Sequence, residues 1–445
     1  MNIKPKQADS NRIFKRTLVI VLLIFASIGI FFRVEGLLAD FLPDARRSPD
    51  EKNYRRYVRQ VHEEGVKGFR SSIRRFIEDP EEHIESPPSR VGYYSWVYLA
   101  GRLMSDKESF RPGVVVSVIS SLVMILITFF LGRALFGLWP AALAAAFVCV
   151  SPIDMVVSHR MWQDGYLAML TAALTWCGYR ILDPGRNFGV LCGLYSAIMI
   201  LGLLSKETFW LYSGCVSMGV ILILLAAQKR PEAIRMGAAL GVSGAVVLTV
   251  NALICGGLDQ WLLSIQYFQT AHHINPWVLR NQTAGPTSIL HAYTLVSPVT
   301  SLGSIIGGLF CMDRMGARMR SGRFNHWLEW FGDARTAYPA VLVSTLTLYV
   351  TVISLEGTLT NLRFVNSVLP IICLLAGHAL HQIYRAMASS FSSPIAWSVL
   401  ALLLISLALL SDIRTYEFYF SHHRIGDLIV QLFIDHGYKG MSKII

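Results

Sequence analysis

Long apolar stretches are the dominant pattern of the chain. Each is close to the roughly 20 residues that a helix needs to cross the hydrocarbon core of a bilayer. The first has a basic flank, as a signal peptide has, but its long apolar part and the poor cleavage site at residues 33–36 favour an uncleaved span. The pattern predicts an all-α polytopic membrane protein with eleven spans, at residues 17–37, 113–131, 138–157, 165–182, 187–204, 209–228, 236–257, 291–312, 338–356, 363–384 and 394–412.

One long polar segment, residues 38–112, follows the first span. Within it, residues 67–77 predict an amphipathic helix with an apolar face and basic residues around it, which lies either on the membrane surface or on the protein's own outer face. Residues 92–104 are short for a span and predict a second surface helix. The expected organisation is one transmembrane domain over residues 1–412, with the outer loop at 38–112, and a short outer tail at 413–445.

Composition and charge agree with this interpretation. Hydrophobic residues make up 53% and charged residues 16%, with a mean hydropathy of +0.47, whereas soluble domains carry about 25% charged residues. These values exclude a disordered chain, a fibrous protein and an ordinary soluble enzyme. The net charge of +11 fits basic cytoplasmic loops, and no nucleic-acid-binding motif is present. The seven cysteines lie in or beside apolar runs, which argues against a disulfide framework.

The distribution of basic residues predicts the orientation in the membrane. With the N-terminus in the cytoplasm, the inner segments hold 17 basic side chains and the short outer loops hold 4. Basic residues concentrate in cytoplasmic loops, so this orientation is favoured over its reverse. An odd number of spans then puts the C-terminal tail outside.

Charged residues near the membrane gather at the outer ends of the predicted spans, although a charge at membrane depth is costly. Carboxylates and cations together suit an anionic, membrane-anchored substrate, because cations stabilise a phosphate leaving group and a carboxylate accepts a proton from an attacking hydroxyl. The residues at these ends are Asp50, Glu51, His159, Arg160, Asp164, Lys206, Glu207, Glu356 and Arg363.

Each main candidate also has a purely structural interpretation. The segment Ser48–Glu51 matches a capping box, with Ser at the N-cap, Pro at N1 and Glu at N3. The i, i+4 spacing of Arg160 and Asp164 predicts one shared helix face, where they could simply pair. Lys206 and Arg363 stand at span ends, where long basic side chains commonly reach the interface.

Other motifs carry less weight. The neighbouring pairs His272–His273 and His422–His423 argue against metal binding, because adjacent side chains on a helix do not face each other. Residues Asn281–Thr283 fit a glycosylation sequon. There is no P-loop and no G-x-G-x-x-G motif after a strand, so nothing indicates nucleotide binding.

In their order along the chain, these segments resemble the GT-C superfamily of membrane glycosyltransferases, in particular its protein O-mannosyltransferase and lipid A aminoarabinose transferase branch. Asp50 and Glu51, followed by Tyr54 and Gly65, resemble the catalytic loop of that branch. PPSRVGYYSWVYLAGRLM resembles its Pro-Pro surface helix, and SHRMWQDGYLAML its second outer loop. LLSKETFWL and LRFVNSVLP resemble its Ser-Lys segment and its Arg-aromatic entry to a late span.

The resemblance implies a GT-C fold and transfer of a sugar from a polyprenyl-phosphate donor to an acceptor hydroxyl on a glycan, a lipid or a protein. Transfer with inversion is expected at the periplasmic face of the cell inner membrane. The implied roles are a general base, Asp50; a residue that positions donor or acceptor, Glu51; cations for the donor phosphate, Arg160, Lys206 and Arg363; and Asp164, which orients Arg160.

Two departures from the family pattern alter these expectations. Several relatives have a Lys before the Pro-Pro pair where this chain has Ser86, so Arg90 is expected to supply that cation. The short tail after the last span disfavours a protein acceptor. No cofactor is implied, although the Asp-Glu pair could bind a divalent ion weakly. Nucleic acid is not expected as a partner.

Two other functions fit the composition. A transporter or flippase of a lipid-linked saccharide would usually show internal repeats and charges near the membrane midplane, whereas here the charges gather at the outer ends. A non-catalytic membrane subunit would not need the acidic and basic residues for any reaction.

Overall fold

The computed structural model describes residues 5–38, 47–79, 87–183, 187–274, 288–320, 331–355, 362–390 and 394–417. Every regular element in these ranges is a helix. The predicted sequon at residues 281–283, Glu356 and the residues after 417 lie outside them.

Six helices among the described residues are long and apolar enough to cross a membrane, and a bent pair adds a seventh. The six are α1 (Pro5–Leu38), α5 (Arg111–Leu135), α10 (Thr208–Ala226), α11 (Arg230–Cys255), α16 (Ala334–Leu355) and α19 (Pro394–Thr415). The bent pair is α6 (Leu138–Val150) with α7 (Pro152–Ser158), which meet at 55°. The remaining predicted spans coincide with α8 (Gln163–Leu182), α9 (Phe188–Leu203), α14 (Ser288–Val296) with α15 (Pro298–Arg320), and α18 (Leu369–Ser390). The predicted multi-pass helical architecture is confirmed.

Three predicted spans are broken, and proline accounts for each break. Pro152 begins α7, Pro298 begins α15, and Pro370 is the second residue of α18. Proline lacks an N–H and restricts the residue before it, so a helix tends to restart at proline. As a result, the span expected at 363–384 divides into a short helix, α17 (Arg363–Asn366), and the long helix α18. Another helix, α12 (Leu258–Ile274), was not predicted.

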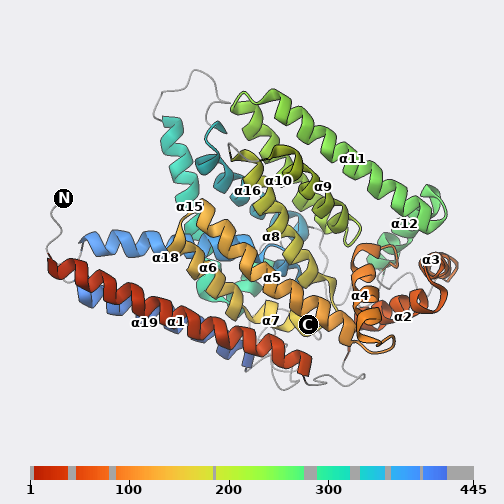
Figure 1. Ribbon diagram of the computed structural model, residues 1–445, viewed down its shortest axis with the longest axis horizontal. Coiled ribbons are helices and arrows are strands. Elements are labelled where there is room, and N and C mark those ends of the chain that lie inside the picture. The colour runs from red at the N-terminus through yellow and green to blue at the C-terminus, as the bar shows by residue number, and fades with distance from the viewer. Residues whose placement is uncertain are drawn as a thin grey trace.

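Small residues let the central helices approach closely. A Cβ on Gly377 of α18 would lie 2.6 Å from the carbonyl oxygen of Pro140 in α6. A Cβ on Gly307 of α15 would lie 2.0 Å from the carbonyl oxygen of Leu375 in α18. Close packing at small residues is the usual way in which membrane helices associate. On the outside of this centre, α1 and α19 run side by side (Figure 1).

The polar loop after the first span builds one end of the bundle. Its helices α2 (Pro49–Glu64), α3 (Lys67–Glu78) and α4 (Val91–Met104) gather there with α12, far from the N-terminal end of α1 (Figure 1). The apolar face of α3 is buried, with Phe76 0% exposed and Ile73 1% exposed, so this helix packs on the protein itself. On α4, by contrast, Leu103 is 79% exposed, as expected for a helix at the membrane surface.

Candidate active site

Six parts of the chain bring the predicted site residues together at this end of the bundle. The start of α2 carries Asp50 and Glu51, and Arg90 immediately precedes α4. The turn between α7 and α8 carries Arg160, and the first turn of α8 carries Asp164. Lys206 lies between α9 and α10, and Arg363 begins α17.

The start of α2 is fixed by the predicted capping box. The Ser48 side chain accepts a hydrogen bond from the backbone N–H of Glu51 at 3.3 Å, and the Ser48 N–H donates to Glu51 Oε2 at 2.9 Å. Two orphan N–H groups at the helix start are thereby satisfied. The cap orients the first turn of α2, so it also sets the direction of the neighbouring Asp50 side chain.

Glu51 joins α2 to the turn between α7 and α8. Its carboxylate is 0% exposed and pairs with Arg47 at 3.0 Å and with Arg160 at 2.9 Å, and it accepts from the backbone N–H of Met161 at 3.1 Å. Burial alone would raise the pKa of Glu51, but Arg160 and Arg47 offset this effect and the pKa is lowered. The carboxylate is therefore charged and fully engaged in holding these segments together.

Asp50 belongs to a second chain of charges. Its Oδ2 lies 2.6 Å from Nη1 of Arg363, whose Nε lies 3.9 Å from Oδ2 of Asp164. Asp164 Oδ1 in turn accepts from Lys206 Nζ at 2.6 Å. The Asp50 and Arg363 side chains are 22% and 19% exposed, whereas those of Asp164 and Lys206 are 1% and 6% exposed. The outer members of the chain can thus meet a ligand, and the inner members support them.

The expectation that Arg160 and Asp164 share a helix face is wrong. Helix α7 ends at Ser158 and α8 begins only at Gln163, so a turn separates the two residues. Arg160 pairs with Glu51, and Asp164 pairs with Lys206 and Arg363. The i, i+4 rule does not apply because it requires an unbroken helix.

Arg90 pairs with Glu207, a residue for which the sequence analysis predicted no role. Its guanidinium contacts the Glu207 carboxylate at 2.9 and 3.3 Å and donates to the Tyr54 hydroxyl at 3.3 Å. The signals for Glu207 in the sequence were its position directly after Lys206 and its place among the charges at the outer ends of the spans. The pKa of Glu207 is lowered, since Arg90 offsets the effect of burial.

Aromatic rings pack against the cations of the site. The guanidinium of Arg363 lies 5.3 Å from the Trp162 ring centroid, and the ammonium of Lys206 lies 4.5 Å from that of Phe364. Burial lowers the pKa of Lys206, and Asp164 opposes this effect. These contacts restrict the cations to defined positions.

The charges of this chain and of the separate Arg90–Glu207 pair compensate one another. The carboxylates of Asp50, Asp164 and Glu207 balance three cations: Arg90, Lys206 and Arg363. An anionic ligand can therefore gain a full ion pair only if a cation leaves its carboxylate. Among the described residues, no group of three or more His, Cys, Asp and Glu side chains is placed to hold a metal ion.

Comparison with known proteins shows which proteins this chain is similar to. The family model of dolichyl-phosphate-mannose-protein mannosyltransferases matches residues 93–254. No relative among curated protein sequences matches the chain. Two solved structures share the fold of this chain, so the predicted GT-C fold is confirmed.

The first of these structures is the archaeal oligosaccharyltransferase AglB from Archaeoglobus fulgidus, in complex with an inhibitory peptide and a dolichol-phosphate. It is 12% identical, with a TM-score of 0.57 over 91% of this chain and 56% of its own. The second is ArnT from Cupriavidus metallidurans in the apo state, 15% identical, with a TM-score of 0.53 over 88% of this chain and 73% of its own. A complex of the Archaeoglobus enzyme with Zn and sulfate has a TM-score of 0.58, at 12% identity, over 89% of this chain and 53% of its own. The chain thus spans little more than half the length of the oligosaccharyltransferase.

Proposed function

We propose that the protein is a glycosyltransferase that moves a sugar from a polyprenyl-phosphate donor to an acceptor hydroxyl. The observation that carries this proposal is the partly exposed pair of Asp50 and Arg363, 2.6 Å apart, at the end of a buried chain of charges. A carboxylate beside a cation supplies the two groups that such a transfer needs. The dolichol-phosphate and peptide bound by the similar oligosaccharyltransferase support a lipid-phosphate donor and a separate acceptor.

In the proposed reaction, Asp50 accepts the proton of the acceptor hydroxyl. The hydroxyl oxygen attacks the anomeric carbon opposite the phosphate, a new C–O bond forms, and the bond from that carbon to the phosphate oxygen breaks. The configuration is inverted and polyprenyl phosphate leaves with the electron pair. Arg363 and Lys206 stabilise the charge on the departing phosphate.

The ion pair between Arg363 and Asp50 gives Arg363 a second role, which is to release Asp50 when the donor binds. Because it pairs with Asp50, the donor phosphate competes with Asp50 for the same guanidinium. Donor binding then frees the Asp50 carboxylate for the acceptor hydroxyl. Lys206 stays paired with Asp164. Arg160 and Arg90 stay paired with Glu51 and Glu207 and add positive charge at fixed positions.

We also propose where the reaction occurs. The excess of basic residues in alternate loops supports a cytoplasmic N-terminus and a periplasmic C-terminal tail in the cell inner membrane. The site then opens to the periplasm, where a lipid-linked donor and an acceptor can meet.

The test uses purified protein in nanodiscs with a panel of polyprenyl-phosphate hexose, pentose and aminosugar donors and a membrane extract as acceptor source. Mass spectrometry follows free polyprenyl phosphate and a sugar-shifted product. We expect both with the wild type and with Asp259→Asn, which changes an exposed carboxylate on α12. We expect neither with Asp50→Asn.

Normal turnover by folded Asp50→Asn would refute Asp50 as the base. Donor that stays intact with wild-type protein, while labelled lipid crosses vesicle membranes, would replace the glycosyltransferase proposal with the flippase.

A further inference from the structure

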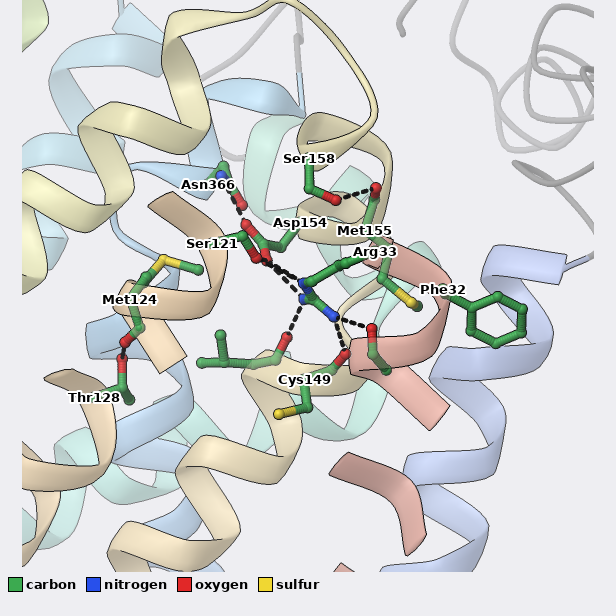
Figure 2. A network of polar contacts seen from close by, with 12 residues as sticks. Phe32, Arg33, Ser121, Met124, Thr128, Cys149, Asp154, Met155, Ser158 and Asn366 are labelled. Atoms are coloured by element: carbon green, nitrogen blue, oxygen red, sulfur yellow. Dashed lines mark hydrogen bonds and ion pairs between the residues drawn. The ribbon is translucent and has the colours of Figure 1, made fainter. Parts of the chain in front are cut away.

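A further charge network, separate from those of Glu51 and Asp50, lies within the bundle at the bend between α6 and α7 (Figure 2). Its centre is Arg33 of α1, paired with Asp154 of α7 at 2.6 Å, and both side chains are 0% exposed. The proposed reaction uses neither residue directly. A buried ion pair is often no more stabilising than apolar packing of the same volume, so its presence here calls for a more specific role.

Arg33 caps the C-terminal end of α6. Its guanidinium donates to the carbonyl of Val148 at 2.8 Å, to that of Cys149 at 2.5 Å and, in its own helix, to that of Gly29 at 2.7 Å. The last carbonyls of a helix have no partner within it. Arg33 therefore stabilises the bend that Pro152 imposes, and the bend sets the direction of α7.

Asp154 connects the bend between α6 and α7 to α17. One carboxylate oxygen, Oδ2, accepts from Arg33 and from the hydroxyl of Ser121 in α5. The other, Oδ1, accepts from the side-chain amide of Asn366 at 3.3 Å. Figure 2 shows Asn366 approaching Asp154 on the side away from Arg33. The network thus extends from α1 through α7 to α17.

Helix α17 depends on such contacts for its position. It has four residues, too few for stability of its own. Arg363 and Asn366 are three residues apart, so they occupy neighbouring positions on this single turn. The residue after the helix, Ser367, accepts from Thr171 of α8 through its carbonyl at 2.6 Å, which holds the turn on another side.

The same network meets the other half of the site. Helix α7 leads directly into the turn that carries Arg160 and Trp162, and the Trp162 ring lies under the Arg363 guanidinium. A shift of α7 relative to α17 would therefore separate Arg363 from its ring and change its distance to Asp50.

We propose that Asn366, fixed by the Arg33–Asp154 pair, is the positioning residue for Arg363. Its side-chain amide sets the register of α17 against α7, so that the guanidinium stands where the donor phosphate arrives. This inference rests on the proposed function, because it assigns Arg363 to that phosphate.

The experiment compares Asn366→Leu, which keeps the branching at Cγ but removes the amide, with the wild type in nanodiscs. We expect the KM for the donor to rise about fivefold, the change expected when one buried hydrogen bond is lost, with kcat within about twofold. Inhibition by polyprenyl phosphate without a sugar should weaken by a similar factor. Asn366→Ala gives the same comparison if the Leu variant does not fold.

The matched control is Ser217→Ala, which removes another buried hydrogen bond, the 2.8 Å contact between Ser217 and Tyr195 that joins α10 and α9. Its donor KM should not change. An unchanged donor KM and inhibition constant in both folded Asn366 variants, or an equal change in Ser217→Ala, would overturn the proposal. Absence of transfer by the wild type would instead count against the proposed function alone.

Discussion

Removing the charge of Asp50 should abolish activity with little effect on stability, whereas removing the charge of the neighbouring Glu51 should destabilise the fold. We expect Glu51→Gln to unfold readily and Asp50→Asn to stay folded but inactive. Both oxygens of Glu51 only accept hydrogen bonds: Oε1 from Arg47 and the Met161 N–H, and Oε2 from Arg160 and Ser48. In the Glu51→Gln variant, an NH2 group replaces one of these two oxygens. That group then faces N–H donors and cannot accept their hydrogen bonds.

The magnitude follows from burial. Removing one partner of a buried ion pair costs about 3–5 kcal/mol, and Glu51 is 0% exposed with two arginines beside it. Asp50 is 22% exposed and has a partly exposed partner, Arg363, for which the expected cost is about 1 kcal/mol or less. The two variants should therefore differ by several kcal/mol in their free energy of unfolding.

The pH dependence gives a second measure of the same effect. The folded-state pKa of Glu51 is lowered, chiefly because the two arginines offset the effect of burial. Its stabilising contribution is thus fully present above the unfolded pKa, about 4.3, and is lost as the pH falls through the folded value. The stability gap between wild type and Glu51→Gln should be constant from neutral pH to about pH 5 and should shrink in stronger acid.

The assay is the fraction of monodisperse protein that survives heating in detergent at a fixed scan rate, measured by size-exclusion chromatography with tryptophan fluorescence. A fixed rate is needed because membrane proteins of this size unfold irreversibly. If Glu51→Gln were as heat-resistant as Asp50→Asn, the conclusion that the buried Glu51 carboxylate holds α2 to the turn between α7 and α8 would be refuted.

Three further predictions concern the other charges. Arg363→Lys should lower kcat/KM for the donor about tenfold or more, since the ammonium cannot replace a planar guanidinium; steady-state transfer assays with varied donor measure this. Asp164→Asn should reduce heat resistance, because Lys206 then stays buried without its nearest carboxylate. The double variant with Lys206→Met should regain heat resistance but not sugar transfer. A thermal scan and a transfer assay measure the two effects separately. Arg33→Met should cost about 3–5 kcal/mol by leaving Asp154 unpaired, and a normal yield of monodisperse protein would contradict this.

The sequence predicted the scaffold well because the determining signals are local. Hydropathy summed over some 20 residues identifies a span whatever its neighbours are. The capping box needs only residues 48–51 and was found as expected. The buried face of α3 shows the limit of such patterns. An amphipathic face predicts that something covers it, but only the fold shows that α2, α11 and α12 do so.

The partners within the site could not be predicted because they depend on segments far apart in the chain. Arg160 is 109 residues from Glu51, and Arg90 is 117 residues from Glu207. The one local pairing that spacing favoured, Arg160 with Asp164, is absent because the chain turns between α7 and α8.

The broken spans explain how a membrane bundle can present several charges at one point. Long helices pack rigidly but direct side chains only along their own faces. The breaks at Pro152 and Pro370 leave two short elements, α7, which lies at 55° to α6, and the four-residue α17. Arg363 lies on one of these elements, and Arg160 follows the other. Short helices are weak on their own, so a buried network that includes Asn366 is the expected accompaniment of such a site, and its residues belong to the design of the site as much as Asp50 does.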